Sequence, residues 1–381
     1  MLSAAALGVI GLTIQQLLPQ LAQRRFLLPL LLVLSALALI ISGPLIFGTL
    51  PGLSFIYIAT LPVTFLVLPA SLLLYTRALT ASTPWRWQWR DIRVFWPQLL
   101  AIPLALLIVT LPVEQQQALF FADDAELQGQ QLITAVLFFI ATLLWLLLSL
   151  VSVLRIALII KGYRQQLKQV FAADSGKRLG WLGALMGILL LTWCYAVLVF
   201  LLPEPSPWFS EAGVLLLALV LVWLLCSCGL NQQPGFAELA AAPQAEAEPD
   251  EAMTTTDNAK YQRSALGEAQ AQRIAAKVQQ AVYSGQLYLD PALTLYKLAE
   301  HIGVSAQYLS QTLNQTLQQS FYDYINEARI VAAKQLLQQT DDSALNIAMA
   351  VGFNARSSFY KAFKVSTGLT PAQYRAQQSV P

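Results

Sequence analysis

The chain has 381 residues, of which 56% are hydrophobic and only 12% are charged, and its formal net charge is +2. Because soluble proteins carry about 25% charged residues, this composition argues against an ordinary soluble globular protein and indicates an integral membrane protein with a polar tail. The cysteines Cys194, Cys226 and Cys228 lie in or beside apolar stretches and the single histidine is His301, so the sequence predicts no disulfide framework, no metal, no cofactor and no enzyme.

Seven apolar stretches follow one another in the first part of the chain: 1–21, 26–49, 53–76, 95–113, 131–160, 180–202 and 212–230. A membrane-spanning helix needs about 20 apolar residues, so we expect a seven-helix transmembrane bundle over residues 1–230. The first stretch is the weakest, because Gln15 and Gln16 interrupt it. It lacks the basic leading region and cleavage site of a signal peptide, and we interpret it as a span.

The basic residues of this region all fall in alternate loops: Arg24, Arg25, Arg77, Arg86, Arg90, Arg93, Arg155, Lys161, Arg164, Lys168, Lys177 and Arg178. The intervening loops 48–52, 114–130 and 203–211 contain no Lys or Arg. Because basic loops remain on the cytoplasmic side, the N-terminus is predicted to lie outside and residue 231 onward inside. The sequence therefore predicts a multi-pass protein of the bacterial inner (cytoplasmic) membrane, in contact with the lipid bilayer.

Three features of the membrane half have two interpretations each. Four tryptophans occupy one basic loop and favour an interfacial aromatic belt, with a ligand or lipid pocket as the alternative: Trp85, Trp87, Trp89 and Trp96. Gly183 and Gly187 have the spacing that allows helices to pack closely, which is compatible with a homodimer. Cys226 and Cys228 are interpreted as small span residues, with palmitoylation or redox chemistry as the alternative.

Residues 231–259 form the next region and contain six acidic residues but no Lys or Arg. They are rich in Ala, Pro, Gln, Glu and Thr, which cannot bury a core, so we expect a flexible acidic linker. Residues 260–381 hold 11 Lys and Arg against seven acidic residues. A basic domain beyond an acidic linker suits nucleic acid.

The C-terminal region is predicted to be all-helical. A helix from about Ser264 to Ser284 ends before Gly285, and Asp290-Pro291 marks a turn. Two similar helix pairs follow, joined by a long amphipathic helix from about Phe321 to Gln338. Thr370-Pro371 begins a short final helix, with proline at a tolerated first position.

The two helix pairs repeat at an offset of 49 residues. Thr294 corresponds to Ser343, each as the cap of a first helix, and Gly303 corresponds to Gly352 at the turn. Five further pairs correspond: Leu298 with Ile347, Ala299 with Ala348, Val304 with Phe353, and, at an offset of 50, Leu309 with Phe359 and Leu313 with Phe363. Ser305 and Asn354 are expected to cap the second helices. A cap, a small residue at the helix crossing and a glycine at the turn predict two helix-turn-helix motifs.

One set of residues extends from the connecting helix through the second motif: Leu336-Leu337, Ile347-Ala348, Val351-Gly352-Phe353, Ser357-Ser358-Phe359, Phe363-Lys364, Gly368 and Thr370-Pro371. These residues resemble the signature of the AraC/XylS family of transcription regulators. The first motif agrees at Leu298-Ala299, Val304-Ser305 and Tyr308-Leu309-Ser310. The resemblance covers about the last 100 residues. It implies that each second helix enters the DNA major groove and that RNA polymerase is a partner.

Candidate DNA-contacting residues lie on the two second helices. Exposed residues at successive helical turns can bond base edges, which selects Gln307, Ser310, Gln311 and also Asn314 in the first motif. In the second motif the same reasoning selects Arg356, Ser357 and Lys361, with Lys364 on phosphate. The family's base-contacting positions fall on the same residues, without Asn314 and Lys364. Leu313, Asn314 and Gln318 depart from the family pattern, which leaves the first recognition helix without positive charge.

The sequence as a whole predicts a membrane-bound, sequence-specific transcription regulator. The membrane half would sense a small molecule, a lipid or a membrane state, and the C-terminal domain would bind promoter DNA. The alternatives are a transporter or membrane enzyme with a regulatory tail, and a membrane half that is only an anchor. The absence of Asp, Glu and Lys from span interiors argues against ion-coupled transport.

Overall fold

The computed structural model describes residues 1–81, 85–122, 127–172, 179–201, 211–232, 236 and 267–378. Within these residues all regular elements are helices, and the one additional feature is an isolated antiparallel bridge between Phe171 and Thr294. The chain divides into two compact units. Unit 1 comprises Met1–Lys161 and Leu179–Ala241, and unit 2 comprises Gly162–Arg178 and Ala242–Pro381. The all-helical fold class is therefore confirmed for the described residues, whereas most of the predicted linker 231–259 lies outside them.

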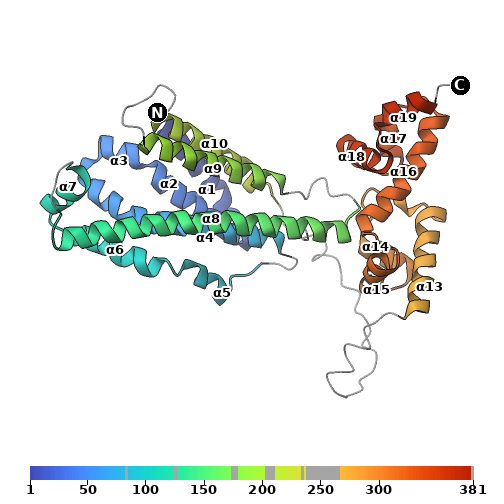
Figure 1. Cartoon of the computed structure of the whole chain (residues 1–381), viewed down its shortest axis with the longest axis horizontal. Helices are drawn as coiled ribbons and strands as arrows, with labels where there is room; N and C mark the ends of the chain where they lie inside the picture. Colours follow the sequence, from blue (N-terminus) through green and yellow to red (C-terminus); the bar gives the residue numbers. More distant parts are fainter. Residues whose placement is uncertain are drawn as a thin grey trace, which may run out of the picture. The chain divides into compact units, whose positions relative to one another are not determined.

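Unit 1 is built from long apolar helices that run side by side (Figure 1). Contacts join α1 to α2 and α10, α2 to α4, α4 to α6, and α9 to α10. The helices are α1 (Leu2–Leu17), α2 (Leu28–Ile41), α3 (Gly43–Thr49), α4 (Ser54–Thr80), α5 (Trp89–Ile92), α6 (Gln98–Thr110), α7 (Val113–Phe121), α8 (Gln130–Val170), α9 (Gly180–Leu201) and α10 (Glu211–Gly229). Short 3-10 turns η1 (Leu18–Gln20), η2 (Arg25–Leu27), η3 (Pro51–Leu53) and η4 (Arg93–Phe95) connect several of them.

Among the described residues, five helical segments are long and apolar enough to cross a membrane: Leu2–Gln20, Arg25–Thr49, Pro51–Thr80, Gln130–Val170 and Ala212–Gly229. A sixth span is possible by length if Trp89–Phe95 and Gln98–Thr110 count as one element, although they are bent by 47°. The remaining predicted stretch, 180–202, corresponds to a shorter apolar helix, Gly180–Ala196. Each predicted stretch thus contains a helix, and seven spans stay a prediction.

One predicted loop is wrong in its detail, because residues 114–130 contain the helix α7. Gln116 on α7 is buried, and its Nε2 donates hydrogen bonds to the carbonyls of Ile108 at 2.8 Å and Leu111 at 3.0 Å. The last carbonyls of a helix have no partner within it, so this amide satisfies the end of α6. A loop assignment based on polarity did not anticipate that a glutamine would donate to the carbonyls at the end of α6.

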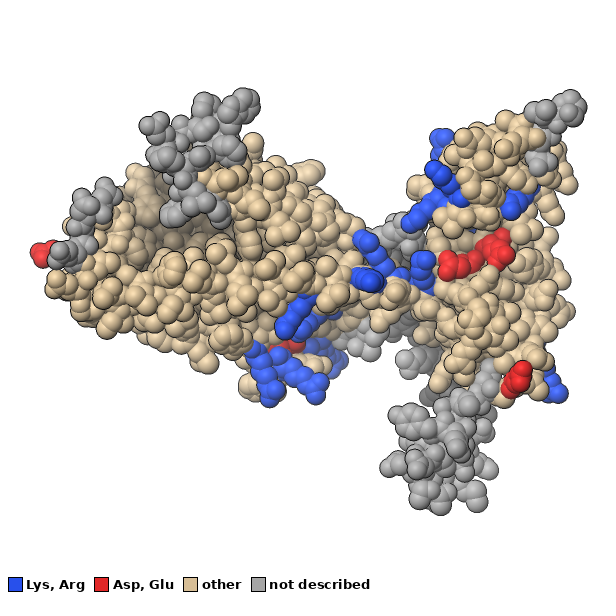
Figure 2. Space-filling model, viewed as in Figure 1, with Lys and Arg blue, Asp and Glu red and all other residues tan. Residues whose placement is uncertain are grey.

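The charges of unit 1 are distributed unequally along the bundle. Figure 2 shows Lys and Arg side chains gathered near α5, with some acidic surface among them, and one acidic patch at the opposite end, near α7. Trp87, Trp89 and Trp96 are exposed at the same end as α5, and Trp87 stacks on Phe95 with ring centroids 6.3 Å apart. This arrangement agrees with an interfacial belt of aromatic and basic residues.

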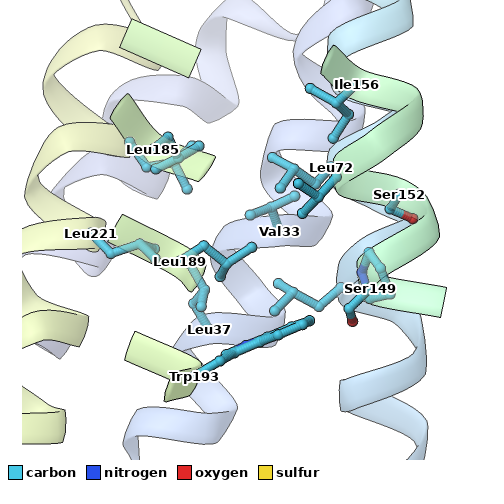
Figure 3. Close-up of a pocket in the computed structure, with 14 residues that line it drawn as sticks. Val33, Leu37, Leu72, Ser149, Ser152, Ile156, Leu185, Leu189, Trp193 and Leu221 are labelled. Carbon is cyan, nitrogen blue, oxygen red and sulfur yellow. The ribbon is translucent and has the colours of Figure 1, made fainter. Parts of the chain in front are cut away.

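A small apolar cavity lies among α2, α4, α8, α9 and α10. Figure 3 shows Val33, Leu72 and Leu189 converging between the helices, with Trp193 along one edge. Its volume is about 30 Å³, which is room for only one or two water molecules. This cavity has no room for a ligand as it stands.

Unit 2 consists of two small helical subdomains joined by one long helix (Figure 1). Its helices beyond the end of α8 are α13 (Glu268–Gln279), α14 (Leu295–Ile302), α15 (Ala306–Gln311), α16 (Phe321–Gln339), α17 (Ala344–Ala350), α18 (Arg356–Thr367) and α19 (Pro371–Gln378). Wide turns of π type, η5 (Gln280–Ser284) and η7 (Thr312–Thr316), extend α13 and α15, and η6 (Leu287–Leu289) is a 3-10 turn. The predicted connecting helix 321–338 is confirmed as α16 to within one residue.

Three of the four predicted caps are confirmed. The side chains of Thr294, Ser305 and Ser343 each accept a hydrogen bond from the backbone amide three residues later. The prediction for Asn354 is wrong, because α18 begins at Arg356 and no side chain caps it. Asn354 Nδ2 instead donates to the carbonyl of Pro291 at 3.3 Å, which links the second motif to the first.

Each subdomain of unit 2 has its own apolar core. The first contains Leu298, Leu309 and Leu313, and the second contains Ile347, Phe359 and Phe363. α16 contributes to both cores, with its N-terminal half in the first and its C-terminal half in the second. The repeated apolar positions therefore form equivalent cores.

Candidate nucleic-acid interface

The first candidate recognition helix is α15 with its continuation η7. Leu309 faces the core, while Gln307 is exposed and Ser310 and Gln311 are half-buried on the other side. Gln311 Nε2 donates to Gln315 Oε1 at 2.9 Å, so its amide is already engaged in the free protein. The three predicted side chains share a helix that carries no charged residue.

A segment from outside the predicted domain covers part of this subdomain. The last turns of α8 belong to unit 2, and Gln169 Oε1 accepts a hydrogen bond of 3.0 Å from Asn314 Nδ2. Lys168 forms an ion pair of 3.7 Å with Asp323 at the start of α16. Asn314, which sequence reasoning placed among the DNA-contacting residues, thus has a partner within the protein.

The backbone of this segment is fixed as well. The amide of Ala172 donates to the carbonyl of Leu293 at 3.4 Å, and the carbonyl of Ala172 accepts from Asn326 at 3.3 Å and Arg329 at 3.4 Å. Ala172 is 1% exposed and belongs to the first core. Sequence analysis assigned residues 162–172 to the basic loop after the fifth apolar stretch, and no sequence signal indicated that they would join the C-terminal subdomain.

The second candidate recognition helix, α18, presents a row of cationic side chains. Arg356, Lys361 and Lys364 are exposed, as is Ser357. α18 contains no acidic residue. Figure 2 shows basic side chains grouped where Figure 1 places α18. All four predicted side chains are therefore accessible to DNA, and α18 carries the positive charge that α15 lacks.

Arg356 has a defined orientation before any ligand binds. Its Nη2 donates to the Tyr360 hydroxyl at 3.1 Å, and its Cζ lies 4.9 Å from the centroid of the Tyr360 ring. A guanidinium held in this way loses less side-chain entropy when it pairs with a base. Sequence reasoning did not single out Tyr360, although its spacing of four residues from Arg356 on a predicted helix could have shown the pair.

A buried arginine holds the two motifs together. Arg329 on α16 is 0% exposed, and it donates to the carbonyls of Tyr288 at 2.8 Å and Asp290 at 2.9 Å. Its Cζ also lies 5.4 Å from the ring centroid of Phe353 in the second motif. Burial lowers the pKa of Arg329 to about 10, although the nearby Asp290 carboxylate acts in the opposite direction, so the group is cationic at neutral pH.

No group of His, Cys, Asp and Glu residues suitable for holding a metal occurs among the described residues. The features of unit 2 are thus two helix-turn-helix motifs, a fixed connection between them and one cationic face. Such an arrangement can bind a polyanion and place two helices against it.

Comparison with known proteins supports this architecture. Residues 298–377 match the family model described as a helix-turn-helix domain. The melibiose operon regulatory protein of Escherichia coli (strain K12) is 38% identical over 86 residues, which are 23% of this chain and 28% of that protein. An HTH-type transcriptional regulator of Staphylococcus aureus (strain COL) is 35% identical over 102 residues, 27% of this chain and 14% of that protein. The chain therefore spans less than a third of either relative.

Solved structures are also similar to part of the chain. One is a transcriptional regulator from Chromobacterium violaceum described as containing an AraC-type DNA-binding domain, 31% identical, covering 28% of this chain and 96% of that chain with a TM-score of 0.26. Another is the C-terminal domain of the response regulator yesN from Fusobacterium nucleatum, 34% identical, covering 26% of this chain and 97% of that chain with a TM-score of 0.25. The match of residues 298–377 to the family model shows a helix-turn-helix domain in this part of the chain.

Proposed function

We propose that this protein is a membrane-bound transcription regulator of the AraC/XylS type. Unit 1 resides in the inner membrane and responds to a small-molecule or membrane signal. Unit 2 binds promoter DNA in the cytoplasm through α15 and α18, which enter successive stretches of the major groove. Binding of RNA polymerase by unit 2 is part of the proposal and rests on the family resemblance.

The observation that carries the proposal is the pair of helix-turn-helix motifs with an accessible cationic helix. α16 spans both cores, and Arg329 and Asn354 add contacts between the motifs, so the two recognition helices keep one spacing. A fixed spacing selects DNA sites whose two half-sites match it. Arg356 and Lys361 suit guanine, and Gln307 and Gln311 suit adenine.

The two motifs contribute unequally to affinity in this proposal. α18 supplies three cationic side chains, whereas α15 and η7 supply none. Most of the salt-dependent affinity for DNA therefore comes from the second motif, and the first adds sequence discrimination. A second copy of the chain would strengthen the weak half by raising the local concentration of binding domains.

The placement of unit 1 in a membrane is supported by its long apolar helices and by the basic residues at one end of them. Those basic loops and the chain beyond residue 231 fall on the same predicted side. The positive-inside rule then places the helix-turn-helix domain in the cytoplasm, where DNA is accessible.

The test uses the full chain reconstituted in lipid nanodiscs. Genome-wide fragments bound to it are sequenced, and the affinity for the strongest fragment is measured by fluorescence anisotropy at 50 and 200 mM salt. We expect affinity to fall by roughly tenfold or more over this range, because counterions are released from DNA phosphates. Recovery of no reproducible fragment, or an affinity that is independent of salt, would contradict the proposal.

A further inference from the structure

A polar cleft in unit 1 has no role in the proposed function. It has a volume of about 660 Å³ and is open to solvent. It lies between the end of the first helical segment and the end of α10, lined mainly by Thr13, Gln16, Gln20, Arg24, Ser227 and Asn231. Binding sites for small molecules have volumes of roughly 300–1,000 Å³, so this cleft has room for a ligand, unlike the apolar cavity.

The lining is rich in hydrogen-bond donors and has one positive charge. Arg24 is half-buried, and one guanidinium N–H donates to Gln20 Oε1 at 3.3 Å, which leaves most of its five donors available. No carboxylate of the described residues lines the cleft. A cationic donor set without a neutralising acid attracts an anion, and a guanidinium fork matches the oxygens of phosphate.

The remaining side chains add groups that recognise hydroxyls. Asn231 uses one Nδ2 hydrogen on the carbonyl of Ser227 at 3.0 Å, which leaves its Oδ1 as an acceptor. The side-chain amide of Gln16 lines the same cleft from α1. The backbone carbonyl of Gln16, and not its side chain, accepts a hydrogen bond of 3.1 Å from Gln20 Nε2. Amides of this kind both donate to phosphate oxygens and accept from alcohols.

The cleft also explains an irregularity of the first apolar stretch. Polar residues within a membrane-spanning helix are costly unless they face a polar partner or cavity. Gln16 lines the cleft, whereas its neighbour Gln15 does not. The cleft lies at the end of unit 1 that carries Arg24 and the exit of α10, where the topology places the cytoplasmic head groups.

We propose that this cleft binds a glycerol phosphate group, with Arg24 on the phosphate and Gln16 and Asn231 on the glycerol hydroxyls. The group could come from an anionic lipid such as phosphatidylglycerol or from free glycerol 3-phosphate. This inference rests on the membrane placement of unit 1 in the proposed function, but it does not rest on DNA binding.

The experiment measures binding of phosphatidylglycerol to the full chain in nonionic detergent by native mass spectrometry, with phosphatidylcholine as the zwitterionic reference. Arg24→Gln is compared with Arg25→Gln, since Arg25 is the neighbouring exposed arginine and does not line the cleft. We expect Arg24→Gln to weaken phosphatidylglycerol binding by about tenfold or more and Arg25→Gln by less than about threefold. Equal losses in the two variants, or equal binding of the two lipids by the wild type, would overturn the site.

A second matched pair of variants tests the site even if Arg24→Gln does not fold. Gln16→Leu makes the first span more apolar and is expected to weaken lipid binding about fivefold, because one amide hydrogen bond to a glycerol hydroxyl is lost, whereas Gln15→Leu leaves it unchanged. Free glycerol 3-phosphate is added as a competitor. If glycerol 3-phosphate displaces phosphatidylglycerol, the ligand is a soluble one, and if it does not, the ligand is the lipid head group. If neither probe binds, the proposal is refuted. Membrane fractionation of the same cells tests the placement of unit 1 separately.

Discussion

Two arginines of unit 2 carry the same charge in opposite surroundings. Arg329 is fully buried and donates to backbone carbonyls, whereas Arg356 is exposed on α18 and rests against Tyr360. A buried cation requires complete hydrogen bonding, and an exposed one is available to a ligand. We therefore expect the first to act on stability and propose that the second acts on binding.

Replacement of Arg329 by Met is expected to lower the free energy of unfolding of unit 2 by about 3 kcal/mol, because the carbonyls of Tyr288 and Asp290 lose their donor. Lys334→Met on the same helix is the control, with an expected change within about 0.5 kcal/mol. Urea unfolding followed by circular dichroism measures both. Similar stabilities for the two variants would show that Arg329 is not structurally important.

The pH dependence of this contribution follows from the pKa of Arg329. Burial lowers that pKa from the ordinary value of arginine to about 10, so the cost of burying the charge is fully present below pH 10 and is relieved only above it. We therefore expect the difference between wild type and Arg329→Met to be constant between pH 6 and 9. A difference that changes across this range would assign the effect to another group.

Replacement of Arg356 by Ala is expected to weaken specific DNA binding by about tenfold or more, because a guanidinium held in place by Tyr360 can pair with guanine. Gln311→Ala should cost less, since the amide of Gln311 must first leave Gln315. Arg273→Ala, which removes an exposed arginine of α13, is the control for charge alone. A larger loss of DNA affinity for Gln311→Ala than for Arg356→Ala in an anisotropy assay would contradict the unequal contributions of the two motifs.

At the scale of elements, the two turns of the repeated motifs have the same sign of φ but different surroundings. Gly303 has φ of +68° with open space around the position of a Cβ atom. Gly352 has φ of +91°, and a Cβ there would lie 2.6 Å from the carbonyl oxygen of Tyr288. The second turn is thus also a point of close contact between the motifs.

Gly303→Ala is expected to destabilise unit 2 by about 1 kcal/mol, which is the cost of the left-handed conformation for a residue with a side chain. Gly352→Ala carries the same cost and a backbone clash, so a loss greater than about 3 kcal/mol is expected. Thermal unfolding of the two variants compares them directly. Equal losses would mean that the contact with Tyr288 relaxes freely.

The last turns of α8 form another element whose role was not visible beforehand. Because Ala172 is buried in the first core, a separately expressed fragment of residues 260–381 lacks part of that core. A synthetic peptide of residues 162–178 is expected to bind this fragment and raise its melting temperature. The Ala172→Asp peptide should bind about tenfold more weakly or worse, because it would bury an unpaired charge. Equal binding of both peptides would refute this contact.

At the scale of the whole molecule, the topology of unit 1 decides where the helix-turn-helix domain lies. The apolar helices alone do not fix an orientation, and the proposed orientation comes from the positive-inside rule applied to the basic loops. The reverse orientation, with the N-terminus on the cytoplasmic side, would place unit 2 outside the cytoplasm and away from DNA. The proposed function therefore depends on this one property of unit 1.

Cysteine labelling tests the topology in a chain whose Cys194, Cys226 and Cys228 are replaced by Ser. Gln117→Cys on α7 is expected to react with a membrane-impermeant maleimide in intact spheroplasts, because α7 lies in a loop predicted to be outside. Gln23→Cys, in a basic loop, should react only after lysis. Both glutamines are exposed, so access does not distinguish them. Labelling of Gln23→Cys in intact spheroplasts would reverse the proposed orientation.

The sequence by itself determined the helices of the two helix-turn-helix motifs, their repeated cores, three of the four caps and the accessibility of Arg356 and Lys361. These properties depend on residues close together in the chain, where helical periodicity and capping chemistry act. Only the tertiary structure decided that Asn354 bonds to Pro291, that Asn314 bonds to Gln169 and that Arg329 connects the motifs. Those contacts join residues at least 24 and up to 145 positions apart, and a polar side chain chooses among such partners only when the packed chain brings one of them within reach. The polar cleft is of the same kind, because Arg24 and Asn231 become neighbours only when α1 packs against α10.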